Sequence, residues 1–356
     1  MATMEISTNV ACKVQCDFCP QELHIKEYST KNDLKNISYG QPTQMSFETF
    51  KKCLSKLPKS VKISFSGYTE PFLNPNCSKM IFYAHEQNFP VEVCSTLVGM
   101  KEEDIEKIEN IPFTNFFLHF PDSSNHAKIA VNEQYLKIVK KLLSSNINNF
   151  QGMAMGKLHP KIESIIEKMR YSDKMISRAG NCENIESIPK KIGALSCTRA
   201  TKTDLVDRID DNVLLPNGDV ALCCMDFGLQ NIIGNLLEID YESLYHTENY
   251  KKVDRNLKSN DEYIMCRFCE QSMPKEEIID RQNLKSDIQK KQDVNANKIV
   301  EIYQEKLKRY PDRAGFEYFY SKITNNEMSF SDLEKTIIVS EEYISSHTPF
   351  IKLKTD

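Results

Sequence analysis

The chain has 356 residues, of which 40% are hydrophobic and 27% charged, and its formal net charge is −4 at pH 7. This length exceeds what one simple core needs and predicts one large domain with one or two smaller ones. A slightly acidic chain without a strongly basic composition is not expected to bind nucleic acid. No apolar run is long enough to span a bilayer, and the first residues contain no basic and apolar leader, so we expect a cytoplasmic protein without a membrane partner.

Strands and helices alternate through the first 180 residues. Apolar patterns predict strands over 5–10, 60–67, 91–96, 114–120, 149–156 and 174–180. A long polar loop follows the first strand, and helical spacing predicts helices over 47–57, 76–87, 102–109, 132–145 and 159–170. Ser46 is the expected N-cap of the first of these helices, and His159 with Pro160 begins the last.

This alternation predicts an α/β fold in which parallel strands are joined by right-handed crossovers. Six units are fewer than the eight of a complete barrel, so the two candidates are a doubly wound open sheet and a curved, partial (βα)6 barrel of TIM type. Polar residues recur just past several strand ends, where barrel enzymes place their sites. These segments are Cys12–Cys19, Gly67–Glu70, Ser95–Thr96 and His119–Asp122. We therefore expect the partial barrel.

The pattern changes after residue 180. "NVLLPNGDVALCC" predicts a tight β-hairpin that turns at Pro216–Asp219. A short helix near 240–246 and the "CRFC" pair at 266–269 follow it. We expect a barrel over 1–180, a small hairpin and helix domain over 181–270, a charged helical linker over 271–293 and a helical domain over 294–356, with Ser329 or Ser331 capping its last helix.

Twelve cysteines are many for a chain without an export signal, and clustered cysteines in a reducing compartment more often bind metal than form disulfides. Cys12, Cys16 and Cys19 form a C-x3-C-x2-C triplet. A zinc ion would need a fourth ligand, which His24 could supply. A [4Fe–4S] cluster can be held by three thiolates with its fourth iron left open.

The triplet, with Phe18 before its last cysteine and a position after the first strand, resembles the radical S-adenosylmethionine (SAM) enzymes. "GYTEP" at 67–71 resembles the Gly-Gly-Glu segment of that superfamily, although its middle residues differ. The resemblance implies that Glu70 and this glycine-containing turn hold the amino group of the SAM methionine and that Phe18 lies near the adenine. The expected cofactor-binding set is Phe18, Gly67, Tyr68, Thr69, Glu70, Thr96 and His119.

A second set of cysteines comprises Cys197, Cys223, Cys266 and Cys269. Together with the "GDVALC" hairpin and "IGNL" at 233–236, it resembles the auxiliary-cluster extension of some radical SAM enzymes, called SPASM or, in its short form, twitch. The resemblance implies one auxiliary [4Fe–4S] cluster. Cys224 could replace Cys223, but the spacing from Gly218 favours Cys223. A four-cysteine zinc site is the alternative.

The resemblance implies an enzyme that cleaves SAM reductively and abstracts hydrogen from a substrate with a 5′-deoxyadenosyl radical, supplied with electrons by a ferredoxin or flavodoxin. Related enzymes often modify peptides, and they carry a recognition domain before the barrel that residues 1–11 are too short to form. We therefore expect a small substrate such as a sugar or aminocyclitol, with a peptide as the alternative. A zinc-stabilised binding or scaffold protein is the alternative from a different class. The "PDRAGFEYF" and "SEEY" segments of the tail resemble a small helical domain often appended to larger proteins.

Overall fold

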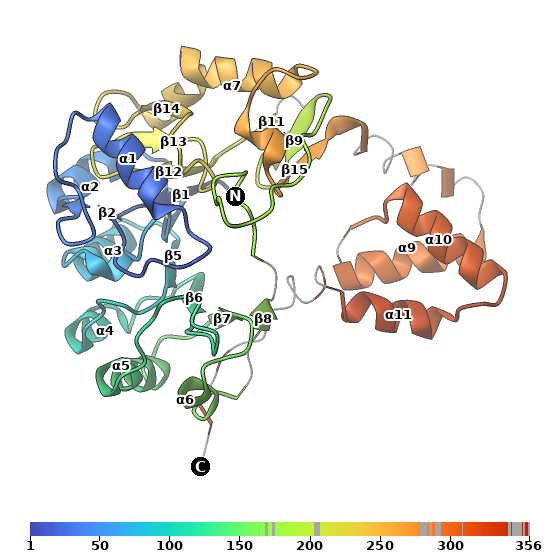
Figure 1. The fold of residues 1–356 in the computed structure, drawn as a ribbon, viewed down its shortest axis with the longest axis horizontal. Coiled ribbons are helices and arrows are strands. Elements are labelled where there is room, and N and C mark those ends of the chain that lie inside the picture. Colours follow the sequence, from blue (N-terminus) through green and yellow to red (C-terminus); the bar gives the residue numbers. More distant parts are fainter. Residues whose placement is uncertain are drawn as a thin grey trace.

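The computed structural model describes residues 1–354 except 168–169, 173–174, 203–206, 278–282, 285–286, 289–292, 308, 341–342, 344–350 and 352. Figure 1 shows a curved sheet with helices along its outer side and a separate group of helices formed by the C-terminal part of the chain. No helix in the described ranges is both long enough and apolar enough to cross a membrane. The α/β partial barrel expected from the sequence is confirmed.

One sheet of nine strands runs through the described residues in the order β14–β13–β12–β1–β4–β5–β6–β7–β8. Its parallel strands are β1 (Thr3–Ile6), β4 (Lys62–Phe65), β5 (Val91–Ser95), β6 (Asn115–His119), β7 (Phe150–Met155), β8 (Arg170–Ser172) and β12 (Asp211–Leu214). The hairpin strand β13 (Asp219–Ala221) and β14 (Ile232–Asn235) continue the sheet antiparallel. The expected hairpin therefore extends the barrel sheet directly, because β12 pairs with β1.

Four of the predicted helices cover the outer face of the parallel strands. They are α2 (Phe47–Leu54), α3 (Cys77–Glu86), α4 (Glu102–Ile108) and α5 (Glu133–Leu143). The backbone N–H of Thr49 donates to Ser46 Oγ over 2.9 Å, so Ser46 is the N-cap. Outward side chains of the strands, such as Met4, Ile63 and Val93, are fully buried beneath these helices, whereas alternate residues face the inside of the barrel.

Two predictions near the sixth unit are wrong. The sixth strand, β8, lies at 170–172 instead of 174–180, because Arg178, Ala179 and Gly180 all have positive φ angles (54°, 58° and 79°) and form a left-handed turn that no strand contains. The helix expected over 159–170 is the single turn α6 (Pro160–Glu163), which His159 caps as predicted. The chain after α6 pairs instead with the C-terminal segment, since Lys354 N–H donates to the Ile165 carbonyl over 3.0 Å.

The polar loop expected after the first strand contains more structure than predicted. A helix, α1 (Gln21–Lys31), follows the cysteine triplet. The short strand β2 (Asn9–Val10), which precedes the triplet, pairs with β3 (Thr43–Gln44), which follows α1. The weak amphipathicity of α1, which buries only Gln21, His24 and Tyr28, explains why its sequence resembles a loop.

The end of the chain packs against the outside of the barrel where a sixth helix would lie. Ile351 is buried, and its N–H donates to the Phe150 carbonyl on β7 over 3.0 Å. A Cβ atom built on Gly152 of β7 would lie on top of Ile351 Cδ1, so the glycine is what lets the segment approach the sheet. The C-terminal segment thus replaces the missing helix.

We expect Ile351→Ala to lower the free energy of unfolding by about 2 kcal/mol, because buried isoleucine side chains lose transfer energy and leave a cavity when truncated. Thermal unfolding under anaerobic conditions measures the change. Ile338→Ala, at a residue that is 40% exposed on the separate helical group, is the matched control and should leave the melting temperature nearly unchanged. Equal melting temperatures for both variants would contradict this packing role.

Short elements complete the region around the second cysteine set. They are β9 (Leu195–Cys197), β10 (Thr201–Lys202), β11 (Asp207–Arg208), the 3-10 helices η2 (Tyr241–His246) and η3 (Met265–Phe268), helix α7 (Glu248–Lys258) and β15 (Ser272–Pro274). A further 3-10 helix, η1 (Pro71–Leu73), lies in the barrel between β4 and α3 and contacts α3 and β5. The short helix expected near 240–246 is η2, and α7 was not predicted. Strands β9 and β15 pair, with Cys197 opposite Ser272.

The C-terminal helices α9 (Val294–Leu307), α10 (Arg313–Thr324) and α11 (Phe330–Ile338) form a hydrophobic cluster of their own. Its centre includes Ile299, Tyr303, Phe316 and Leu333. Ser329 caps α11 by accepting the Asp332 N–H over 3.2 Å, so of the two predicted caps Ser329 is the one used. Much of the linker expected over 271–293 lies outside the described residues, and the proposed domain limits stay a prediction.

Candidate functional site

The triplet Cys12, Cys16 and Cys19 lies on the loop between β2 and α1, and all three residues line one large cavity inside the barrel. The loop curls because Ala11 and Gln15 adopt positive φ angles of 77° and 54°. The Cys19 N–H donates to the Cys16 carbonyl over 3.1 Å. The three thiols therefore come from a tightly wound segment at the carboxyl edge of the parallel sheet.

Gln21, the first residue of α1, ties this loop to its surroundings. Its side-chain oxygen accepts the Cys12 N–H over 3.1 Å, and its amide donates to the Cys19 sulfur and to the Tyr68 carbonyl. This buried amide connects the triplet to the "GYTEP" loop. Gln21 was not among the predicted site residues, although its place two residues after the last cysteine is a visible signal in the sequence.

Burial raises the pKa of the Cys12 thiol to about 12 and raises those of Cys16 and Cys19 as well. Buried thiols of this kind stay protonated in water at neutral pH, and a metal that coordinates them removes the proton. All twelve cysteines are free thiols, so none of them is part of a disulfide bond. The donor set suits thiolate ligation of metal.

The "GYTEP" loop follows β4, as predicted, and begins with a turn that requires glycine. Gly67 has a φ angle of +76°, and an added Cβ would come within 3.1–3.2 Å of Val213 and Ser7. Its N–H donates to Glu5 Oε2 over 3.0 Å. The loop is thereby fixed between β1 and β12, with its following residues facing the cavity.

Glu70 is buried, and its carboxylate joins the ends of β4 and β5. One oxygen accepts the Phe72 N–H (3.1 Å) and the Ser95 hydroxyl (2.8 Å), and the other accepts the N–H and hydroxyl of Thr96 (both 2.6 Å). Four donors occupy the roughly four lone-pair sites of a carboxylate. An ammonium group held here would share or displace these donors, so the carboxylate also has a positioning role that sequence alone did not indicate.

Tyr68 connects the cofactor loop to the second cysteine set. Its side chain is fully buried, and its hydroxyl lies 2.8 Å from the Cys223 carbonyl and 3.1 Å from the Asp226 carbonyl. Thr69 donates to the Asn9 carbonyl over 3.3 Å, which holds the preceding turn. Tyr68 occupies one of the middle positions at which "GYTEP" differs from the family segment, so the difference has a structural purpose.

Tyr68→Phe should destabilise the protein, because the two buried carbonyls would lose their shared donor, at a cost of about 1–3 kcal/mol. For a chain of this size that corresponds to a fall of a few degrees in the melting temperature. Tyr263→Phe is the matched control, since the Tyr263 hydroxyl donates to Gln230 at an exposed site. If the Tyr68→Phe protein were as stable as the Tyr263→Phe protein, the hydrogen bonds of the Tyr68 hydroxyl would contribute nothing to the free energy of unfolding.

Phe18 and His119 form one wall of the cavity. Their rings stack with centroids 5.3 Å apart and an angle of 18° between planes. Burial lowers the pKa of His119 to about 4, so the imidazole is neutral at pH 7, and its Nε2 has no hydrogen-bond partner among the described residues. Asp122 instead caps the following loop by accepting the His126 and Ala127 N–H groups, and it does not line the cavity.

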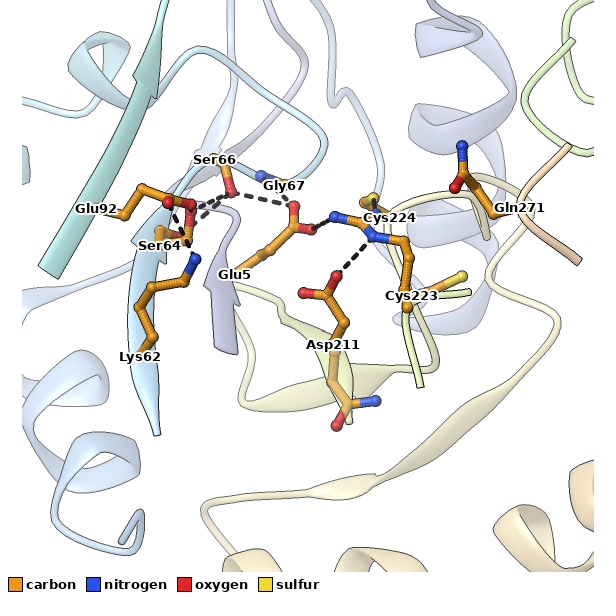
Figure 2. A network of polar contacts seen from close by, with 12 residues as sticks. Glu5, Lys62, Ser64, Ser66, Gly67, Glu92, Asp211, Cys223, Cys224 and Gln271 are labelled. Carbon is orange, nitrogen blue, oxygen red and sulfur yellow. Dashed lines mark hydrogen bonds and ion pairs between the residues drawn. The ribbon is translucent and has the colours of Figure 1, made fainter. Parts of the chain in front are cut away.

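The inner face of the barrel carries charged residues below the cofactor loop. We call Glu5, Lys62, Ser64, Ser66, Glu92, Arg199 and Asp211 the polar floor. Lys62 pairs with Glu92 over 3.0 Å, and Ser66 donates to Glu5 over 3.0 Å. Figure 2 shows these side chains converging, with Glu5 and Asp211 reached by the same guanidinium. The polar floor was not predicted, although charged residues at alternate positions of otherwise apolar strands are a visible signal in the sequence.

Arg199 connects the second cysteine region to the polar floor of the barrel. It follows β9, and its guanidinium contacts Glu5 (3.2 Å), Asp211 (2.6 Å) and the sulfur of Cys224. Cys224 lines the cavity, whereas Cys223 does not. The adjacent cysteines therefore lie in different environments, which supports the choice of Cys223 for the second set.

The second set, Cys197, Cys223, Cys266 and Cys269, gathers around β9, η3 and the end of β13. Burial raises the pKa of Cys266, and the neighbouring Cys269 and Cys197 raise it further. Burial also raises the pKa of Cys223, and the neighbouring Cys224 and Cys266 raise it further. The four residues thus come together from three places in the sequence.

Arg267, inside the C-x2-C pair, is fully buried and organises this region. Its guanidinium donates to the carbonyls of Lys191, Gly193, Asn256, Ser259 and Glu262 at 2.7–3.3 Å. None of its contacts within the described residues is a carboxylate. A buried cation without an anionic partner is costly, and four thiolates on an iron–sulfur cluster would supply negative charge beside it.

The described residues contain no group of three or more His, Cys, Asp or Glu side chains that could hold a single metal ion. Zinc requires ligands that converge on one ion, whereas the thiolates of a [4Fe–4S] cluster each bind a different iron and lie farther apart. His24, the candidate fourth zinc ligand, packs its ring 4.5 Å from that of Tyr68 in the core. The three thiols of the triplet and the four of the second set match the numbers of thiolate ligands of a SAM-binding and of a fully ligated [4Fe–4S] cluster.

Comparisons with known proteins agree with this geometry. The family model of the radical SAM superfamily matches residues 6–170, and that of an iron–sulfur cluster-binding domain, SPASM, matches residues 210–270. The chain belongs to the radical SAM superfamily and carries a SPASM domain; it is an enzyme whose cofactors are a [4Fe–4S] cluster with SAM and an auxiliary iron–sulfur cluster. No curated protein matches the chain significantly.

Three solved structures illustrate the fold likeness. BtrN in complex with AdoMet and 2-DOIA is 15% identical, with 73% of this chain and 88% of that chain covered and a TM-score of 0.48. Native anSMEcpe with bound AdoMet is 11% identical, with 75% and 86% covered and a TM-score of 0.46. SuiB of Streptococcus suis bound to S-adenosylmethionine is 12% identical, with 72% and 68% covered and a TM-score of 0.40.

Proposed function

We propose that this enzyme abstracts a hydrogen atom from a polyhydroxylated small molecule, such as a sugar or an aminocyclitol, and oxidises it. One observation carries the proposal: the triplet, the "GYTEP" loop and the polar floor share one cavity of about 680 Å³. Small-ligand sites typically enclose about 300–1,000 Å³. Because this cavity also has to accommodate SAM, the remaining space suits a compact substrate better than a folded or extended peptide.

Cys12, Cys16 and Cys19 are the proposed ligands of the SAM-binding cluster. When bound, the cluster and SAM supply a 5′-deoxyadenosyl radical for hydrogen abstraction. Gly67, Tyr68, Thr69, Glu70 and Thr96 shape the turn that receives the methionine end. Phe18 and His119 offer a flat, uncharged surface for the adenine, since a stacked pair of neutral rings suits another aromatic ring.

The rest of the cavity wall separates the reacting groups from water. Phe117, Met153, Met225 and Phe227 line it with apolar surface, and the polar floor supplies hydrogen-bonding groups at the opposite end. A polyol would place its hydroxyl groups against the polar floor and expose a C–H bond toward the cofactor loop. This orientation selects the position that is oxidised.

Cys197, Cys223, Cys266 and Cys269 are the proposed ligands of the auxiliary cluster. Lys191 lies beside them and donates to the carbonyls of Cys269 and Ser272, both over 2.6 Å. With four cysteines available, we infer complete protein ligation, which leaves no iron for substrate and favours an electron-transfer or structural role. The electron donor we infer is a low-potential ferredoxin or flavodoxin.

The test uses anaerobically reconstituted enzyme with SAM and dithionite, supplied in turn with sugars, inositols, aminocyclitols and short cysteine-containing peptides. We expect one compact polyol to increase 5′-deoxyadenosine formation at least tenfold and to yield a product two hydrogen atoms lighter. Deuterium at the oxidised carbon should appear in 5′-deoxyadenosine. Stimulation by a peptide alone would overturn the proposal in favour of peptide modification.

A further inference from the structure

The polar floor follows the register of the sheet. Glu5 of β1 lies beside Ser64 of β4, which lies beside Glu92 of β5, so these three form a row across adjacent strands. Lys62 and Asp211 form a second row, one on either side of Thr3. Both rows lie N-terminal to the cofactor loop along their strands, so they face a different part of the cavity from Glu70 and Thr96.

Charge is not balanced within the polar floor. It contains three carboxylates, Glu5, Glu92 and Asp211, but only two cations, Lys62 and Arg199. Lys62 is engaged by Glu92, and Arg199 bridges the other two carboxylates. The serines donate as well, Ser64 to Glu92 and Ser66 to Glu5, each over 3.0 Å. One negative charge remains without a cation of its own.

The unpaired negative charge of the polar floor is located at Asp211. Its Oδ2 accepts from Arg199, whereas its Oδ1 is buried and has no hydrogen-bond partner in the described part of the chain. Leaving a buried carboxylate oxygen without a donor is costly, and a ligand that brings a donor removes that cost. A second donor is therefore missing at a defined atom on the cavity wall.

We propose that Asp211 is a specificity-determining residue that binds a protonated amine of the substrate, with the hydroxyl groups on the same carbon skeleton held by Glu5, Ser64 and Glu92. This inference rests on the proposed function and narrows its substrate class to amino-polyols. A neutral polyol would fill the space but leave Asp211 without its charge partner.

Two probes that differ in one group test the proposal directly. Scyllo-inosamine carries an amine where scyllo-inositol carries a hydroxyl, and the rings are otherwise the same. Binding of each to the reconstituted holoenzyme with SAM is measured by anaerobic calorimetry. We expect scyllo-inosamine to bind at least tenfold more tightly. Equal affinities, or binding of neither probe, would overturn the proposal without the use of any variant.

Variants then locate the effect. Asp211→Asn should reduce the preference for the amine to threefold or less, while iron content and SAM binding stay as in the wild type. Asp254→Asn is the matched control, since Asp254 pairs with Lys258 on the outside of α7 and should keep the full preference. An Asp211→Asn enzyme that retains the tenfold preference would show that another group binds the amine.

The pH dependence gives a readout that a purely structural role would not produce. Burial raises the pKa of Asp211 to about 6, with Arg199 opposing the shift and Glu5 reinforcing it. The charged or titratable groups that face it are Glu5, Lys62, Glu92, Arg199, Cys197 and Cys224. Since only the ionised carboxylate attracts an ammonium group, affinity for scyllo-inosamine should fall as the pH drops through 6, and affinity for scyllo-inositol should not.

The two levels of inference fail in different ways. If polyols are oxidised with no advantage for amines, the proposed function stands and the role of Asp211 is wrong. If only peptides stimulate 5′-deoxyadenosine formation, the proposed function itself is wrong. Binding of scyllo-inosamine with the expected preference, but no oxidation of any amino-polyol, would support the subsite and contradict the reaction.

Discussion

Replacing any one of Cys12, Cys16 and Cys19 by alanine is expected to reduce 5′-deoxyadenosine formation by at least a thousandfold. All three thiols line the cavity, and the loop that carries them is fixed by Gln21 and by the turn at Cys16 and Cys19. A cluster with one iron reserved for SAM has only three protein ligands, so the loss of any one of them prevents the cluster from binding. The measurement is chromatography of reaction mixtures after anaerobic reconstitution, with iron content determined in parallel.

Cys182→Ala is the matched control for this series. Cys182 is buried near the same loop, and its sulfur lies 3.5 Å from the Phe18 carbonyl, but it belongs to neither proposed ligand set. We expect this variant to keep most of the wild-type rate and about eight irons per chain. A triplet variant that cleaves SAM normally, or a Cys182→Ala protein that loses its iron, would show that the ligands have been assigned wrongly.

The part of the site that sequence could predict consists of residues close together in the chain. The triplet, "GYTEP", the hairpin and the "CRFC" pair each lie within a few residues, and their spacing carries the signal. The order of strands and helices from α2 through α5 was equally accessible, because each of these elements has its own periodicity. The sixth unit was not, since the chain after the single-turn α6 pairs with the returning segment at Leu353 and Lys354.

The polar floor shows why the remainder was missed. Each strand contributes only one or two of its residues, and an isolated charge in a short strand is usually an exposed one. Glu5, Lys62 and Glu92 become a site only when the register brings them side by side on the inner face. Arg199 was still harder to identify, because it reaches the barrel from the second cysteine region.

Arg267 is a similar case with larger energetic consequences. Its five carbonyl partners belong to segments around Lys191, Gly193 and the end of α7, and carbonyl groups have no sequence signature. In the sequence it is simply one of two residues between the paired cysteines. Among the residues that the structure describes, it is the largest fully buried side chain, and the loop of Cys266 and Cys269 folds around it.

Arg267→Ala should therefore destroy the order of this loop. At least five carbonyl acceptors would lose their donor, and each carbonyl left without a partner costs up to about 1–3 kcal/mol, although water reaching these partly buried groups would offset part of this. Even part of that sum is a large fraction of the stability of a typical domain, about 5–15 kcal/mol. We expect the iron content to fall from about eight to about four per chain, because one of two cubanes is lost.

The N-terminal cluster should survive this substitution, since the triplet is held by contacts that do not involve Arg267. Slow SAM cleavage without substrate would then persist while substrate oxidation stops. Arg255→Ala, at an exposed residue of α7, controls for loss of an arginine and should retain both clusters. Full iron content in Arg267→Ala would mean that the second cysteine set does not depend on the buried guanidinium, and loss of all iron would mean that the two regions fold as one unit.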